Sequence, residues 1–446
     1  MIGLLGIVLI IITIILCIKD VSYGIVVFFV TRILIPESVR IPGGAISLNT
    51  AIIFLLFLFS LIKILCVGKM EMNGRFGMAL VIFVLYAALA LSMADYGSIS
   101  VQFSTLIKFI ITDLTPAYIL FLNLKTEKQF NRIIKGLVVI SIICCSYGIL
   151  SAIIGRNVYI EFISNSLDAE VYVRDAVLWS GFETSSTFVS TNSFGYFIVL
   201  CLPFFVYLFS KGIYKSETKV AIVLFLINVI LCKKRTTFVV CLFYIAMWII
   251  SGDIKKRIKL FIYMFAPTIM IIVAIFTLPQ LSKLKSFIMI STFFWDDSIY
   301  RGVAGMQAGS TWELRTRQFI YPLTEIKSNI LFGHGYGWCG WYLATYELHP
   351  ILFGFETILS QLICDYGIMG YIIYPFVMIC SGKFASASKR IKNKYIIMFF
   401  ASTILLMIGT GAVYWYLFLM IIILMHYCET QDNHKQLDLR STCLND

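Results

Sequence analysis

The chain contains repeated apolar runs of the length needed to cross a lipid bilayer, and they leave it few ways to fold. A membrane-spanning helix needs about 20 mostly apolar residues, because its backbone N–H and C=O groups must pair with one another inside the hydrocarbon. Thr50–Leu65, Ala221–Leu231 and Tyr395–Ile408 are examples of such runs. With 60% hydrophobic and 13% charged residues, the chain does not resemble a soluble domain. The sequence predicts an all-α, polytopic transmembrane helical bundle.

Candidate spans can be placed along most of the chain. They are residues 2–18, 22–35, 48–67, 77–93, 105–122, 133–154, 189–210, 219–232, 236–251, 258–278, 354–380, 395–409 and 412–427. The first two are short, and 22–35 suits a half-span or an interfacial helix, so we expect 12 or 13 spans. Residues 2–18 follow no basic region and precede no small-residue cleavage site, so they are expected to be a retained helix rather than a signal peptide.

The loops between these spans predict the orientation, because lysine and arginine are enriched in cytoplasmic loops. Five basic clusters fall in alternate loops, and we expect them and the tail 428–446 to be cytoplasmic. The clusters lie at residues 69–75, 125–135, 211–219, 255–259 and 383–394. The predicted organisation is N-terminal helices in 1–154, a first periplasmic loop in 155–188, central helices in 189–278, a large, partly helical periplasmic loop in 279–353 and C-terminal helices in 354–427.

The net charge of +12 is explained by these basic loops facing anionic lipid headgroups, so no nucleic-acid partner is expected. Most of the twelve cysteines lie in apolar segments, where they act as small hydrophobic residues. Their spacing suggests neither a disulfide framework nor a metal site. We therefore expect no metal and no cofactor.

Three consecutive basic residues, Lys233-Lys234-Arg235, lie in a short loop that is predicted to be on the opposite side of the membrane from the other basic loops. Cations that oppose the orientation rule at the edge of the hydrocarbon indicate an anionic partner such as a lipid phosphate. A guanidinium can bind two pyrophosphate oxygens at fixed geometry, while lysines add point charge. We predict that Lys233, Lys234 and Arg235 bind a substrate pyrophosphate. Ordinary snorkelling to the headgroup region is the alternative.

The large loop carries two further arginines. A helix is expected around Thr311–Ile326, and within it Arg315 and Arg317 are two residues apart. Such residues point to different sides of a helix, so only one of them is expected to face a shared site. Arg315 is a catalytic candidate and Arg317 a pyrophosphate-binding candidate.

A glycine-rich stretch follows, with glycines at 333, 335 and 337. Glycine permits a tight turn with exposed backbone N–H groups, although a simple connecting turn explains the stretch equally well. His334 and Trp338 are candidates for contact with a sugar. A surface histidine and an interfacial aromatic residue are the alternatives.

Two residues around the start of the next predicted span are candidates for the general base. Glu356 lies in the otherwise apolar stretch Ile351–Ile363, and an acid near membrane depth tends to face a polar cavity. It is the first choice for deprotonating a sugar hydroxyl, and His349 is the second. A structural ion pair with an arginine is the alternative for Glu356.

Four stretches form a series between residues 170 and 380. Arg174 is followed by Gly181-Phe182 and Thr191-Asn192-Ser193-Phe194-Gly195, and Cys232–Thr237 contains the basic turn. Arg315 is followed by Asn329-Ile-Leu-Phe-Gly, and Gly367-Ile-Met-Gly370 opens the next apolar stretch. In order and spacing this series resembles the O-antigen polymerase and O-antigen ligase superfamily of bacterial envelope enzymes.

The resemblance implies a GT-C-like glycosyltransferase of the bacterial inner membrane that acts at the periplasmic face. Its substrate would be an oligosaccharide repeat unit linked to undecaprenyl pyrophosphate, and a chain-length regulator would be an expected partner. Arg235 matches the family's pyrophosphate-side arginine, while Arg174 and Asn192 belong to the segment that leads into a middle span. No Asp-x-Asp-like metal pair is found in the periplasmic loops, so Arg235, Arg315 and Lys234 are expected to replace a metal.

Three activities are compatible with this resemblance. Ligases of the family resemble one another in a His-Asn/Ser/Gln pair that nine residues separate from the Gly-x-x-Gly, where this chain has Glu356-Thr357. The missing histidine favours a polymerase over a ligase that transfers glycan to the lipid A core. A lipid-linked oligosaccharide flippase is the third reading, but it would carry charge inside its spans rather than in an outside loop.

Overall fold

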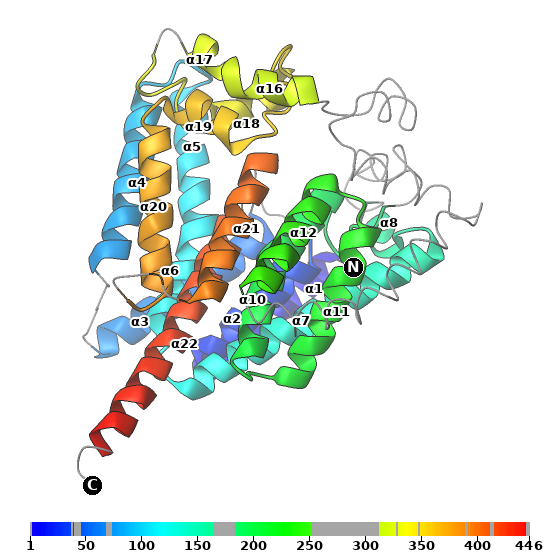
Figure 1. The fold of residues 1–446 in the computed structure, drawn as a ribbon, viewed down its shortest axis with the longest axis vertical. Coiled ribbons are helices and arrows are strands. Elements are labelled where there is room, and N and C mark those ends of the chain that lie inside the picture. Colours follow the sequence, from blue (N-terminus) through cyan, green and yellow to red (C-terminus); the bar gives the residue numbers. More distant parts are fainter. Residues whose placement is uncertain are drawn as a thin grey trace.

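The computed structural model describes residues 2–36, 39, 46–67, 74–164, 183–251, 312–326, 329–346, 348–388, 391, 393–410 and 414–442. Within these ranges the chain is helical and has no β-strand, apart from an isolated bridge between His349 and Phe353. The predicted all-α class is therefore confirmed for the part of the chain that the structure describes. The arrangement of its helices is shown in Figure 1.

The elements follow one another in chain order. They are α1 (Ile2–Lys19), α2 (Val21–Leu34), α3 (Leu48–Val67), α4 (Gly74–Ser92), α5 (Ile99–Phe109), the π-helix η1 (Ile110–Leu114), α6 (Thr115–Asn123), α7 (Glu127–Ile154), α8 (Val158–Ser164), α10 (Thr191–Ser210), α11 (Lys215–Leu231), α12 (Arg235–Ile250), α16 (Trp312–Ile320), α17 (Pro322–Glu325), α18 (Trp338–Tyr346), α19 (Ile358–Tyr366), α20 (Gly370–Ala385), α21 (Lys394–Thr410) and α22 (Trp415–Thr442).

Three helices in the described ranges are long and apolar enough to cross a membrane. They are the continuous helix Ile99–Asn123 (α5, η1 and α6), Glu127–Ile154 and Thr191–Ser210. The pair α19 and α20 passes the same test together, although the two are bent by 119°. Further apolar helices are shorter. The expected number of 12 or 13 spans stays a prediction, and the candidate span 258–278 lies outside the described residues.

Local sequence signals explain where the long helices begin and end. Thr126 caps α7 in a capping box with Gln129, which satisfies two of the backbone N–H groups that a helix start leaves unpaired. The helix ends at Gly155, whose φ of 76° suits glycine. Ser190 caps α10 in a similar way by accepting a hydrogen bond from the N–H of Ser193.

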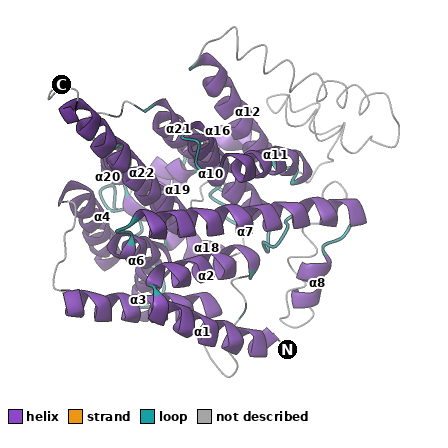
Figure 2. Ribbon diagram, turned by 90° about the horizontal axis from the view of Figure 1, so that it is seen from below, coloured by secondary structure: helices purple, strands orange, loops and turns teal. Residues whose placement is uncertain are grey.

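The core is built around α10, which packs against α11, α12 and α21. Aromatic side chains of α10 are completely buried there, among them Phe194, Phe204 and Tyr207. The first three turns of α22 are also buried. Figure 2 shows α1, α2, α3 and α7 lying side by side across one part of the bundle, in agreement with their contacts.

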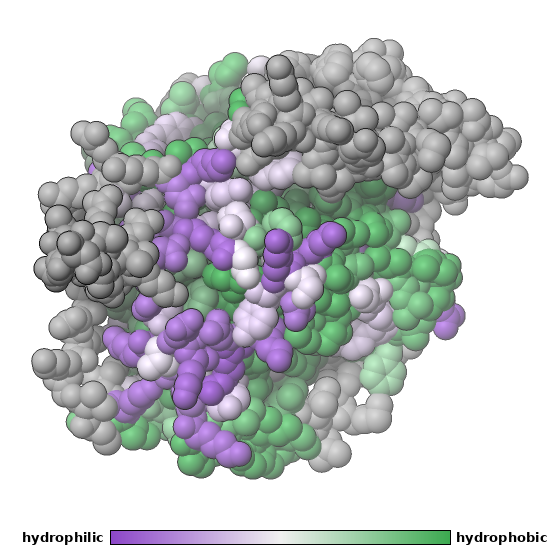
Figure 3. Space-filling view, turned by 60° about the horizontal axis from the view of Figure 1, so that its bottom comes forward, coloured by the Kyte–Doolittle hydropathy of each residue, from purple (hydrophilic) through white to green (hydrophobic). Residues whose placement is uncertain are grey.

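One end of the bundle collects charged side chains, and we call it the basic end. Lys211 pairs there with Glu429 at 2.9 Å, and Arg132 lies 3.3 Å from Asp20. The Lys394 ammonium donates to the backbone oxygen of Ser251 at the end of α12. Figure 3 shows hydrophilic side chains gathered on this side of the molecule.

The opposite end, which we call the loop end, consists of the turns 93–98, 183–190 and 232–234 and the helices α16 to α19. Helices α2, α7 and α11 run from the basic end towards it. A helix rises about 1.5 Å per residue, so the 17 residues of α11 separate the two ends by about 25 Å. The Thr187 hydroxyl donates to the carbonyl of Ile33 near the end of α2, which places turn 183–190 at this end.

Two predicted segments differ from the structure. The apolar stretch predicted as one span, 354–380, is a turn followed by α19 and, after Gly367, by α20 in a different direction. Gly367 has a φ of 65° and ends α19, so the helix cannot continue straight. The span predicted at 412–427 is also longer, because α22 continues to Thr442 into the expected tail.

Candidate functional site

The glycine-rich turn of residues 329–337 packs closely against neighbouring segments at the loop end. Its three glycines have φ values of 63°, 97° and 86°, a region that other residues rarely adopt. A Cβ on Gly335 would lie 2.4 Å from the Cβ of Ala94, and one on Gly333 would lie 2.4 Å from the carbonyl oxygen of Cys364. The stretch is therefore a tightly packed turn between α4 and α19.

Two tyrosine hydroxyls bond to backbone carbonyl oxygens of this turn. The hydroxyl of Tyr86 lies 2.8 Å from the carbonyl oxygens of both Leu331 and Tyr366. The hydroxyl of Tyr96 donates to the carbonyl oxygen of Tyr336. The backbone N–H of His334 donates to the carbonyl oxygen of Cys364 at 2.7 Å. The N–H groups of the turn are therefore in part used by the protein itself rather than exposed as the sequence suggested.

His334 is fixed by a carboxylate and an aromatic ring. Its Nδ1 lies 3.1 Å and 3.2 Å from the two carboxylate oxygens of Asp95, which belongs to the turn between α4 and α5. Its ring stacks on Trp338, with 4.3 Å between the ring centres. Trp338 itself is buried. These two candidates from the sequence therefore lie together, next to an aspartate that the sequence did not single out.

His349 is buried close to the same rings, but its lone pair is used by the backbone. Its Nδ1 accepts hydrogen bonds from the N–H groups of Ile351 and Leu352, at 3.2 Å and 2.9 Å. The Nε2 atom then carries the proton and faces Glu325 at 3.7 Å. Burial lowers the pKa of His349, so the ring is held neutral. This arrangement favours a structural role over the predicted role as a base.

Glu356 lies half-buried in the turn before α19. The next residue, Thr357, caps that helix by accepting a hydrogen bond from Ser360 N–H. Another acid, Asp365 in α19, binds the backbone N–H of Cys339 in α18 at 2.9 Å. Asp365 thus joins two of the helices that surround His334, and Glu356 stays a candidate base.

The basic turn lies at the loop end, away from the cations of the basic end. Lys233 has a φ of 51°, a strained value for lysine, and Arg235 begins α12. The ammonium of Lys234 lies 3.0 Å from the Glu183 carboxylate, whose side chain is only 6% exposed. The Thr236 hydroxyl donates to Gly409 O at the end of α21. Within the described part of the chain, this turn therefore lies at the opposite end of the bundle from Lys211, Arg132 and Lys394.

A further cation at this end was missed from the sequence. The guanidinium of Arg32 lies over the ring of Tyr416, 4.4 Å from its centre. Arg32 is in the last turn of α2, which the sequence analysis treated as a possible half-span. A single arginine near the end of a short apolar run gave no signal that distinguished it from an interfacial anchor.

The remaining candidates from the sequence are Asn192, Arg317, Arg315 and Arg174. Asn192 is exposed in the first turn of α10, and Arg317 is exposed on α16. Arg315 also lies on α16, but its side chain is outside the described part of the chain. Arg174 lies outside the described residues altogether. Their predicted contacts with substrate stay predictions.

Aromatic rings connect the glycine-rich turn with the region of the basic turn. Tyr336 contacts Phe109, and Phe109 contacts Trp415 edge to face. The neighbouring Tyr414 contacts Tyr196 in the second turn of α10. The loop end therefore has an aromatic layer that lies between its two polar parts and the apolar core.

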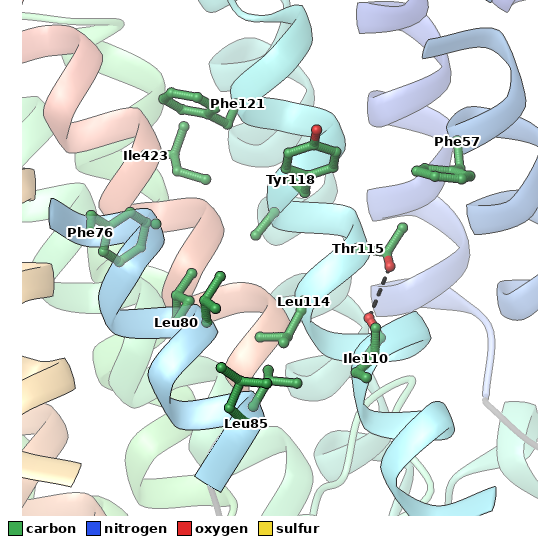
Figure 4. Close-up of a pocket in the computed structure, with 14 residues that line it drawn as sticks. Phe57, Phe76, Leu80, Leu85, Ile110, Leu114, Thr115, Tyr118, Phe121 and Ile423 are labelled. Atoms are coloured by element: carbon green, nitrogen blue, oxygen red, sulfur yellow. Dashed lines mark hydrogen bonds between the residues drawn. The ribbon is translucent and has the colours of Figure 1, made fainter. Parts of the chain in front are cut away.

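An apolar groove lies between α3, α4, η1, α6 and α22 (Figure 4), and its lining residue Phe76 stacks on Phe384 near the basic end. It has a volume of about 470 Å³. Val81 and Leu85 on α4 are exposed, so the groove opens to the outside of the bundle. The lining residues are Phe57, Phe76, Gly77, Leu80, Val81, Val84, Leu85, Ile110, Leu114, Thr115, Ala117, Tyr118, Phe121 and Ile423.

The π-helix forms part of this groove, and the sequence explains it. Pro116 has no backbone N–H, so it cannot continue the α-helical hydrogen-bond pattern. The backbone hydrogen bonds change to the π-helical spacing, and both the N–H and the hydroxyl of Thr115 donate to the carbonyl oxygen of Ile110, five residues earlier. Such π-bulges are often found at functional sites.

No family model, curated protein or solved structure matches this chain. The arrangement of the loop end and the groove therefore carries the functional interpretation. The resemblance to O-antigen polymerases and ligases remains an expectation from the sequence.

Proposed function

We propose that this chain is a membrane glycosyltransferase that polymerises oligosaccharide repeat units linked to undecaprenyl pyrophosphate. The observation that carries the proposal is the position of the basic turn. Lys234 and Arg235 lie at the end of the bundle opposite the other described basic clusters, close to the membrane-spanning helix α10. Lysine and arginine are normally enriched on the cytoplasmic side, so cations at the opposite end indicate an anionic partner. The pyrophosphate of a lipid carrier is such a partner.

The reaction requires stabilisation of negative charge as the pyrophosphate leaves. Cations that are fixed before the reaction, in a poorly hydrated site, provide such stabilisation at low reorganisation cost. In this chain the ammonium of Lys234 is fixed by Glu183, and Arg235 is held at the start of a helix. We assign the pyrophosphate to these two residues together with Lys233 and whichever of Arg315 and Arg317 faces the site, without a metal ion.

The groove of Figure 4 suits the apolar part of such a substrate. It opens to the outside of the bundle between the loop end and the basic end, so a chain embedded in the bilayer could reach it laterally. The aromatic residues of the loop end would contact the sugars, as aromatic faces commonly pack against apolar surfaces.

We place the protein in the bacterial inner membrane as a GT-C-like bundle of 12 or 13 spans. The basic end would face the cytoplasm, because Lys and Arg favour that side, and the loop end would face the periplasm. A chain-length regulator is the proposed protein partner.

Deletion of the gene in its own host tests this function. We expect lipopolysaccharide that carries a single repeat unit, because one unit is still attached when polymerisation fails. Complete absence of O-antigen would instead indicate the ligase, or a flippase that supplies both enzymes. Restoration of long chains by the wild-type gene, but not by the Arg235→Ala variant, is the expected control.

A further inference from the structure

One buried nitrogen at the loop end has no hydrogen-bond partner. Less than 1 Å² of His334 Nε2 is exposed, and no donor or acceptor in the described part of the chain contacts it. Leaving a buried polar atom unpaired costs about 1–3 kcal/mol, so such atoms are uncommon and call for an explanation.

The other ring nitrogen of His334 determines the chemistry of Nε2. Nδ1 faces both oxygens of the Asp95 carboxylate, and an ionised carboxylate only accepts hydrogen bonds. The proton of the neutral ring is therefore on Nδ1, and Nε2 holds a lone pair. His349 has the reverse arrangement, because its Nδ1 lone pair accepts two backbone N–H groups.

The ring of His334 has little freedom to move. Its backbone N–H is bonded to Cys364 O, its face stacks on Trp338, and the glycines on either side are tightly packed. Asp365 and His349 also interact electrostatically with it. A histidine that is oriented by a carboxylate and presents a fixed lone pair has the arrangement of a general base.

We propose that His334 is the group that takes the proton from the acceptor hydroxyl and that Asp95 is its positioning residue. This inference rests on the proposed glycosyl transfer. The acceptor oxygen forms a bond to the anomeric carbon of the donor while its proton moves to Nε2. The bond from that carbon to the pyrophosphate oxygen breaks, and its electron pair stays on the pyrophosphate. His334 later releases the proton to solvent.

Nε2 is covered in this structure, so the acceptor must displace the side chains over it. The Asp95 carboxylate lies on the accessible side of the pair, with 59% of its side chain exposed. His349, the second candidate base from the sequence, fits less well, since its Nδ1 lone pair already accepts two backbone N–H groups.

The test uses substitutions that separate anchoring from proton transfer. His334→Asn keeps a donor at the position of Nδ1 but removes Nε2, whereas Asp95→Asn keeps Nε2 but removes the carboxylate. His426→Asn is the matched control, because His426 Nδ1 contacts Phe384 O at the basic end. The purified full-length variants are assayed with synthetic repeat unit on undecaprenyl pyrophosphate.

We expect His334→Asn to lower kcat about 100-fold or more with little change in KM, and Asp95→Asn to lower it less. His426→Asn is expected to react like wild type. If His334 only anchors the turn, His334→Asn transfers at the wild-type rate, which would overturn the proposal.

A second measurement does not depend on turnover. Magic-angle-spinning NMR of protein labelled with ¹³C and ¹⁵N at its four histidines distinguishes the two ring tautomers. The signal lost in His334→Asn is expected to be the Nδ1–H form, and the signal lost in His349→Asn the Nε2–H form. An Nε2–H form for His334 would overturn the proposed orientation of His334 by Asp95, even if transfer is confirmed. If His334 has the Nδ1–H form but the protein shows no transfer, the orientation by Asp95 is supported and only the proposed glycosyl transfer is contradicted.

Discussion

Replacement of Gly335 by alanine is expected to destabilise the loop end strongly. The residue has a φ of 97°, and an added Cβ would lie 2.4 Å from Ala94 Cβ and 2.9 Å from Ala90 O. The backbone strain alone costs about 1–3 kcal/mol, and the contact with α4 adds to it. The variant should melt at a lower temperature in detergent, accumulate to lower levels in cells and lose most of its transfer activity.

Gly340→Ala is the matched control for this prediction. Gly340 lies in α18, close in sequence, but an added Cβ would meet nothing within 4 Å. Alanine also favours a helix more than glycine does, so this variant should be as stable as wild type or slightly more stable. Equal melting of the Gly335→Ala and Gly340→Ala proteins would show that the glycine-rich turn is not packed as described.

Loss of Lys234 should reduce both stability and activity, for different reasons. Lys234→Met removes the ammonium from the nearly buried carboxylate of Glu183, which costs about 1–3 kcal/mol. It also removes a cation that we assign to the pyrophosphate. The double variant Lys234→Met/Glu183→Gln should recover most of the stability, because the nearly buried carboxylate that Lys234 balances is then replaced by a neutral amide.

The double variant separates the two roles. If Lys234 binds substrate, the double variant melts near the wild-type temperature and still transfers at least about tenfold more slowly, the loss expected when a charged contact is removed. Recovery of wild-type transfer in the double variant would mean that Lys234 serves only to neutralise Glu183. Lys234→Arg, which keeps the charge, is the control for both measurements.

The sequence predicted the elements that depend on local composition. The length of the apolar runs placed α10, α11 and α12 to within a few residues, and a helix was expected around α16 and α17. The break at Gly367 was missed because α19 and α20 together read as one continuous apolar stretch. The π-bulge before Pro116 was missed for the same reason, since it does not change the hydropathy.

The candidate site could be predicted only in part, because its geometry depends on contacts between distant segments. Asp95 and His334 are 239 residues apart in sequence, and no spacing rule connects them. The sequence identified the basic turn from its charge but could not show that Glu183 neutralises Lys234. It also ranked His349 above His334 as a base, because only the fold shows which ring nitrogen is already bonded.

The most direct test of the proposed function is transfer by the purified protein alone. Wild-type protein is mixed with synthetic repeat unit on undecaprenyl pyrophosphate in the presence of EDTA, and the products are separated on a gel. We predict a ladder of polymers that disappears in Arg235→Ala and persists in Lys215→Ala, which removes an exposed cation near the basic end. No ladder from folded wild-type protein, or an unchanged ladder from Arg235→Ala, would contradict the account.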